Sequence, residues 1–216
     1  MPPMLWPKTE RAPVLTPPRR AGKETLAHPS KALRIFVSEI RDRPSPQLLD
    51  VGPVIGANIE FFARMGCKVF VRDLVAERIA DIEKGKLSER LVPGTRWGGL
   101  PYPDEQFDGV LAWDLFDFFA REEVPSVIGE IFRVLKTDGL LLGLFCRERS
   151  EMPEPCQRYR IVDAGILEHE PIDRASGSKL LATRMRNREI LDAFVPHRVL
   201  HFIMLANNMR EIVVRK

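Results

Sequence analysis

Four residues in the first half of the chain have the types and the spacing that bind a nucleotide. Asp50, Gly52 and Gly56 follow a short apolar run, and Asp73 ends a second one, 21 positions after Gly52. Glycine lets a turn approach a ligand, a helix start offers free N–H groups, and a carboxylate accepts hydrogen bonds from sugar hydroxyls. In nucleotide-binding βαβ units an acid meets the ribose roughly 20 residues after the glycine turn. The spacing therefore predicts that Asp73 binds a ribose.

The elements that must position these residues are a strand, a helix and a second strand. Residues 48–50 predict the first strand, residues 59–65 are amphipathic and end at Gly66, and residues 68–73 predict the second strand. A structural interpretation stays open, in which the glycines only shape a tight turn between strand and helix. The two acids at their expected positions favour a ligand.

A later part of the chain predicts two more strands of the same sheet. Residues 107–113 form an apolar run. Residues 122–135 predict a helix that stops at Asp138 and Gly139, before a strand at 140–145. This alternation of strands and helices predicts an α/β fold with a doubly wound, mostly parallel sheet.

The strand at 107–113 brings two side chains to the edge of the sheet where ligands bind. Trp113 and Asp114 stand at its carboxyl end, and open parallel sheets bind ligands outside that end. Asp114 is the candidate catalytic residue, because a carboxylate can orient or deprotonate an acceptor hydroxyl or amine. Its alternative role is that of a helix cap or a solvated carboxylate.

Four segments, taken together, resemble the class I S-adenosylmethionine-dependent methyltransferases: residues 48–58, 68–73, 100–111 and 130–142. Residues 100–111 read LPYPDEQFDGVL and are similar to the family's entry into strand four. The resemblance implies a Rossmann-like, doubly wound, mostly parallel seven-stranded sheet with a C-terminal antiparallel hairpin. It also implies methyl transfer from S-adenosylmethionine to an unidentified acceptor, which we expect to be a small molecule.

The same resemblance implies a cofactor site at the two turns. Gly52 and Gly56 would approach the methionine part of the cofactor, and Asp50 its amino end. Asp73 would bind the ribose hydroxyls. Trp97 would stack on the adenine ring or pack in the core. In full, the implied cofactor-binding residues are Asp50, Gly52, Val54, Gly56, Asp73, Leu74, Trp97 and Trp113.

Two departures from the family pattern keep a second function open. Val54 replaces the middle glycine of the turn, next to Pro53, which lacks a backbone donor. Residues 93–97 offer no acid for the adenine amine. The alternative is a non-catalytic methyltransferase-like binding protein with a degenerate donor site. A nicotinamide-dependent oxidoreductase is disfavoured, because it needs G-x-G-x-x-G and a separate substrate domain.

The N-terminus and one internal segment do not follow the alternation of strands and helices. Residues 1–29 are rich in proline and basic residues, which predicts a disordered tail. An arm over the active site or over a partner subunit is the alternative. Residues 30–216 predict one methyltransferase-like domain. Within it, residues 147–185, with an extended stretch at 158–162, predict a cover on the substrate side.

Composition argues against several other classes. The chain has 216 residues, and its net charge of +3 gives no strong nucleic-acid signal. Its apolar runs are shorter than the ~20 residues that span a bilayer. Three cysteines without CxxC spacing and four dispersed histidines predict neither a disulfide framework nor a metal site. We therefore expect a cytoplasmic protein without a membrane anchor, and its oligomeric state stays open.

Overall fold

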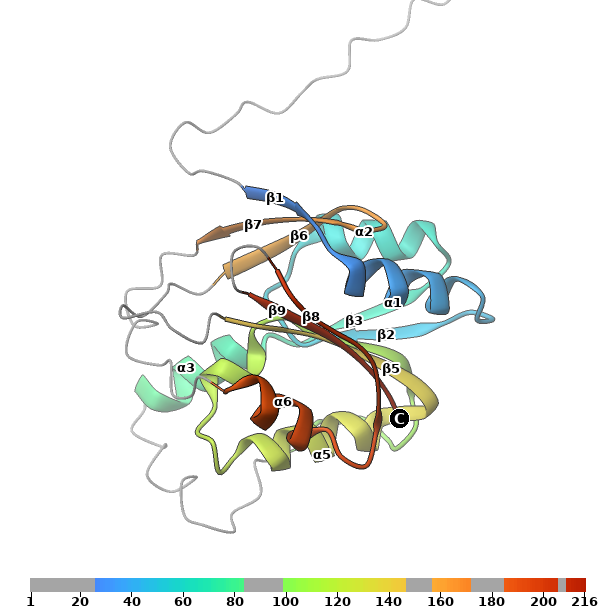
Figure 1. The fold of residues 1–216 in the computed structure, drawn as a ribbon. Coiled ribbons are helices and arrows are strands. Elements are labelled where there is room, and N and C mark those ends of the chain that lie inside the picture. The colour runs from blue at the N-terminus through green and yellow to red at the C-terminus, as the bar shows by residue number, and fades with distance from the viewer. Residues whose placement is uncertain (1–25, 84–98, 147–156, 172–184, 206–208) are drawn as a thin grey trace, which may run out of the picture.

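The chain folds into two sheets and a set of helices. The computed structural model describes residues 26–83, 99–146, 157–171, 185–205 and 209–216. These residues form a six-stranded mixed sheet and a separate three-stranded sheet (Figure 1). No helix within these ranges is long and apolar enough to cross a bilayer.

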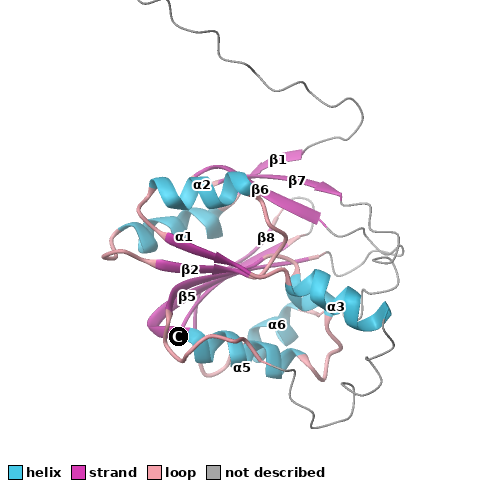
Figure 2. Ribbon diagram, turned by 180° about the vertical axis from the view of Figure 1, so that it is seen from behind, coloured by secondary structure: helices cyan, strands magenta, loops and turns pink. Residues whose placement is uncertain are grey.

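Helices cover both faces of the large sheet. In Figures 1 and 2, helices and the three-stranded sheet lie on one side, and further helices lie on the other. On the first side lie α1 (Lys31–Arg41) and α2 (Gly56–Arg64). On the second side lie α3 (Leu74–Glu83), α5 (Val124–Val134) and α6 (Asn187–Ala193).

The large sheet has the order β3-β2-β4-β5-β9-β8. Its strands are β2 Gln47–Asp50, β3 Lys68–Val71, β4 Phe107–Ala112, β5 Leu135–Phe145, β8 Arg198–Met204 and β9 Arg210–Arg215. β2, β3, β4 and β5 pair in parallel, whereas β9 runs antiparallel to both β5 and β8. From β2 the chain goes outward to β3 and then crosses to β4 on the other side. This reversal creates a switch point between the carboxyl ends of β2 and β4.

The described residues contain a mixed sheet of six strands. A seventh strand stays a prediction, because residues 84–98, between α3 and β4, lie outside the described ranges. One boundary needs a correction, since β5 begins at Leu135 instead of residue 140. Asp138 takes a left-handed conformation with φ 60°, and the register with β4 shifts between Phe107 and Gly109. The turn predicted at Asp138 and Gly139 is therefore an irregularity within β5.

The small sheet joins residues that are far apart in the sequence. Its order is β1-β7-β6, with β1 Leu26–Pro29, β6 Gln157–Asp163 and β7 Ile166–Pro171. The prediction of a tail through residue 29 is wrong for residues 26–29, because their backbone pairs with β7. Pro29, which cannot donate a ladder hydrogen bond, stands at the last position of β1. Residues 1–25 lie outside the described ranges.

A buried carboxylate fixes the start of α1. Glu211 of β9 accepts hydrogen bonds from the Ser30 hydroxyl (2.6 Å) and from the backbone N–H groups of Lys31 (2.9 Å) and Ala32 (3.0 Å). Ser30 in turn caps the helix by accepting from the Leu33 N–H at 3.0 Å. These bonds satisfy N–H groups that a helix start leaves without an internal partner. They also join α1 to the large sheet.

Side chains of each strand alternate between two apolar clusters. Leu49 and Val110 pack with the cluster on the side of α3 and α5. Leu48, Leu111 and Trp113 pack with the cluster on the side of α1, α2 and the small sheet. Successive residues of a strand point to opposite faces. Trp113 therefore lies between the large sheet and the small one.

Candidate functional site

The carboxyl ends of β2, β3 and β4 meet at the switch point. Three backbone hydrogen bonds hold the chain there: Val51 N to Leu111 O (3.0 Å), Arg72 N to Asp50 O (2.8 Å) and Leu74 N to Val51 O (3.2 Å). The glycine turn that follows β2 is thus fixed between the ends of its two neighbouring strands. Asp50, Asp73 and Trp113, predicted from three separate parts of the sequence, come together at this edge.

Asp50 is held by donors of the chain itself. Its side chain is 2% exposed. Its Oδ1 accepts hydrogen bonds from Gly52 N at 2.9 Å and from the indole Nε1 of Trp113 at 2.9 Å. Burial raises the pKa of Asp50 from 3.8 to about 7, although the two hydrogen bonds oppose the rise; the charge of nearby Asp73 adds to it.

The Trp113 indole fills the space above Gly52. A Cβ atom placed on Gly52 would lie 2.4 Å from Trp113 Cδ1, so an alanine does not fit beside this ring. Trp113 is 2% exposed and stacks on Tyr159, with 5.6 Å between ring centroids and 12° between planes. Here the close approach that glycine permits is made by an indole.

The side chains of the other turn residues do not occupy the space that the Trp113 ring fills. Val54 is 70% exposed, so the residue that replaces the family's middle glycine does not fill the turn. Gly56 starts α2, and an added Cβ there would meet nothing within 4 Å. The N-cap residue Ile55 makes no side-chain capping bond to the helix start.

Asp73 stands beside this turn at the end of β3. Its Oδ1 accepts from Ala76 N at 2.8 Å, so this half-buried carboxylate caps the first turn of α3. Leu74 is buried in the core on the α3 side, and its backbone N–H donates to Val51 O. Trp97 lies outside the described residues, so its predicted contact with adenine stays a prediction.

Strand β6 lies across the same edge, held by two buried side chains. Asn58 of α2 donates to Tyr159 O at 2.9 Å and accepts from Ile161 N at 2.8 Å. Asp114, which is 4% exposed, accepts from Gln157 N at 3.3 Å. These are backbone groups of an edge strand of the small sheet, so side chains take the place of a neighbouring strand. The carboxylate predicted to be catalytic thus also anchors β6.

The sequence analysis missed Tyr159 and Asn58. The signal for Tyr159 was present, because residues 158–161 alternate charged and apolar side chains with the period of a half-buried strand. Asn58 gave a weaker signal, as a polar residue on the helix face that turns inward. Its two bonds to β6 depend on a segment about 100 residues away, at sequence separations of 101 and 103.

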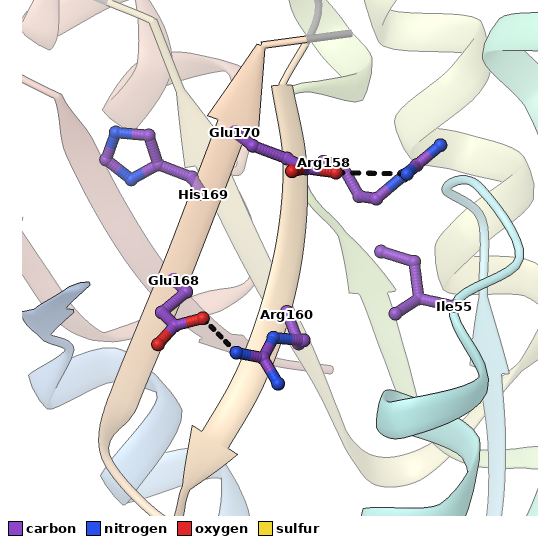
Figure 3. A pocket seen from close by; sticks show the side chains of 6 residues that line it. All are labelled: Ile55, Arg158, Arg160, Glu168, His169 and Glu170. Carbon is purple, nitrogen blue, oxygen red and sulfur yellow. Dashed lines mark hydrogen bonds and ion pairs between the residues drawn. The ribbon is translucent and has the colours of Figure 1, made fainter. Parts of the chain in front are cut away.

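The outer face of β6 and β7 borders a small cavity beside the start of α2. Figure 3 shows it lined by side chains of both strands and by Ile55. The cavity holds about 190 Å³. Arg158 pairs with Glu170 at 3.0 Å, and Arg160 pairs with Glu168. Its four charged side chains thus form ion pairs across the two strands. Within the described ranges, no three His, Cys, Asp or Glu side chains gather in a metal-binding arrangement.

One segment of the chain matches a known protein family. Residues 49–143 match the family model described as a methyltransferase domain. Among curated proteins, none matches the chain.

Several solved structures share the fold. An S-adenosylmethionine dependent methyltransferase from Mesorhizobium loti is 15% identical over 86% of this chain and 96% of its own, with a TM-score of 0.54. One from Methanosarcina mazei is 16% identical over 84% and 96%, with a TM-score of 0.53. The [4+2]-cyclase SpnF is 16% identical over 85% and 79%, with a TM-score of 0.52. At such identities the likeness shows the fold alone.

These matches agree with the motifs in residues 48–142 and with the strand order around the switch point. Residues 49–143 therefore match a methyltransferase domain, and the chain shares the fold of methyltransferases whose cofactor is S-adenosylmethionine.

Proposed function

We propose that this protein transfers a methyl group from S-adenosylmethionine to a small-molecule acceptor. The observation that carries the proposal is the convergence of Asp50, the turn at Gly52 and Asp73 at the switch point of a methyltransferase domain. Ligands of open α/β sheets bind outside the carboxyl ends of the strands at such a point.

The cofactor, when bound, supplies a methyl group that the positive sulfonium already activates. The protein therefore has to hold the reactants in line and exclude water. Asp73 would accept hydrogen bonds from the ribose hydroxyls. The glycine turn and the first N–H groups of α2 would receive the methionine end. Asp114 would orient the acceptor group or take its proton.

The two ends of this site fit the cofactor differently. Asp73 is half-buried at the tip of β3 beside the turn, which suits a ribose. At the other end, Trp113 contacts Gly52 and bonds Asp50, in the space where the methionine part would lie. The methionine end therefore does not fit while the indole keeps this position.

Burial of the reaction edge supports a small acceptor. Trp113 and Asp114 are 2% and 4% exposed, with β6 lying across them. The surface of a protein or a folded nucleic acid does not reach side chains buried to this extent. A small molecule that enters beside β6 does.

Titration calorimetry with S-adenosylhomocysteine tests the donor site. We expect the wild type to bind and Asp73→Asn to bind at least tenfold more weakly. Asparagine keeps an oxygen that accepts from Ala76 N, so the cap of α3 and the melting temperature should be retained. Asp104→Asn is the control, because this exposed carboxylate precedes β4 and lies at the opposite edge of the sheet. Equal affinity of the wild type and Asp73→Asn would contradict the assignment.

One observation favours a second candidate, a non-catalytic methyltransferase-like binding protein. The hydrogen bond between Asp50 and Trp113 joins two groups that a donor site would keep for its ligand. If neither the wild type nor folded variants that lack the indole produce heat or a thermal shift with S-adenosylhomocysteine, this second function is the correct one.

A further inference from the structure

The Trp113 indole has three neighbours that could act together as a closure. Its edge lies against Gly52, its Nε1 donates to Asp50, and its face stacks on Tyr159. The first neighbour belongs to the glycine turn, and the second is the last residue of β2. The third belongs to β6, so the ring links the turn to the small sheet.

The link continues along β6. Tyr159 supplies the ring that stacks on Trp113, and its carbonyl accepts from the Asn58 amide. The same amide group accepts from Ile161 N, and Asp114 accepts from Gln157 N. Because the face of the indole stacks on Tyr159, a movement of the ring away from the turn changes its contact with the strand that these bonds hold.

A buried carboxyl distinguishes this arrangement from ordinary core packing. A buried indole N–H needs an acceptor, but burying a carboxyl to supply it is unfavourable unless donors compensate the carboxyl. Trp113 Nε1 supplies one of the two donors to Asp50 Oδ1, and Gly52 N supplies the other. The indole thus satisfies an acid that the family motif places beside the amino end of the ligand.

We propose that Trp113, Tyr159 and β6 form an autoinhibitory closure over the methionine end of the donor site. Binding of the donor requires the indole to leave Asp50 and Gly52, and this movement loosens β6. The inference rests on the proposed function and adds a regulation to the same site. Apparent affinity for the donor is then lowered by the fraction of molecules in the open state. Contacts that stabilise the closed state weaken donor binding.

Calorimetry with S-adenosylhomocysteine on a set of variants tests the closure. We expect Trp113→Leu and Tyr159→Ala to bind at least tenfold more tightly than the wild type. Trp113→Leu keeps an apolar side chain in case the smaller Trp113→Ala does not fold. Tyr159→Phe retains the stacked ring, and Arg158→Ala removes a side chain that pairs outward with Glu170. Both controls should stay within twofold of the wild type.

Fluorine NMR on protein labelled with 5-fluorotryptophan adds a readout in the unmutated chain. Comparison with Trp113→Phe assigns the Trp113 resonance. Saturation with S-adenosylhomocysteine should shift that resonance, because the ring leaves its place between Gly52 and Tyr159. A shift counts for the closure only together with the gain in affinity of Trp113→Leu, because a ligand beside a stationary ring also changes its surroundings.

The outcomes separate the two proposals. If the wild type binds, the Trp113 resonance does not move and Trp113→Leu gains no affinity, the closure is wrong and the proposed methyltransferase survives. If neither the wild type nor any folded variant binds S-adenosylhomocysteine, the proposed function fails, and the closure fails with it.

Discussion

The indole Nε1 of Trp113 donates a 2.9 Å hydrogen bond to Oδ1 of Asp50, across the switch point between β4 and β2. Asp50 is the last residue of β2, and Trp113 directly follows β4. The two strands are parallel neighbours. The bond therefore joins the residue expected at the amino end of the cofactor to one expected at the reaction centre. Four predictions test this relationship and the structure around it.

Gly52→Ala should destabilise the protein by about 1–3 kcal/mol, because the new Cβ overlaps the indole. Chemical denaturation measures the loss. Trp113→Leu in the same chain should remove most of the penalty, as a double-mutant cycle would report. Gly56→Ala is the matched control, since an added Cβ meets nothing there and the change should be neutral or slightly stabilising. Equal penalties at both glycines would contradict the contact.

Asp50→Asn should remove a pH dependence of stability. The pKa of Asp50 rises from 3.8 to about 7 on folding. Between those pH values the unfolded chain releases the proton and the folded chain keeps it, so the wild type loses stability as pH rises. The loss is on the order of 4 kcal/mol and is complete above pH 7. Urea unfolding at pH 4.5 and pH 8 should show this difference between the wild type and Asp50→Asn. Parallel pH profiles would contradict the burial of the acid.

Asn58→Ala should release β6. The substitution removes the partners of Tyr159 O and Ile161 N, at a cost of about 2–4 kcal/mol. Hydrogen exchange of residues 157–161 should become faster in this variant. Glu60→Ala on the exposed side of the same helix loses a surface ion pair with Arg64 and should change stability by less than about 1 kcal/mol. Unchanged exchange in β6 would rule out the anchoring role of Asn58.

Glu211→Ala should loosen the start of α1. The variant leaves the N–H groups of Lys31 and Ala32 and the Ser30 hydroxyl without their buried acceptor. We expect a loss of about 3 kcal/mol, which denaturation would measure. Glu39 lies on the same helix and forms an exposed ion pair with Arg215. Glu39→Ala removes this ion pair and serves as the control. A loss no larger than that of the control would show that Glu211 does not hold the helix.

Local patterns predicted the elements around the site. The glycine turn, the amphipathic helix after it and the acid at residue 73 follow from short-range spacing, and the structure has β2, α2 and β3 there. The parallel alternation likewise placed Trp113 and Asp114 at the edge of the sheet. These features depend on residues that are neighbours in the sequence.

The contacts across the site could not be predicted in this way. The hydrogen bond from Trp113 to Asp50 spans 63 positions and depends on the register of β2 against β4 and on one side-chain rotamer. The small sheet pairs residues 26–29 with residues 166–169. Such pairing is decided by tertiary packing and leaves little trace in the composition of either segment.

A crystal structure with S-adenosylhomocysteine tests the central claim most directly. We predict the ribose hydroxyls within hydrogen-bonding distance of Asp73, the amino-acid end beside Gly52, and the Trp113 indole moved away from Asp50. Ordered ligand at another place, or crystals soaked at millimolar concentration in which Trp113 still bonds Asp50 and no ligand appears, would contradict it.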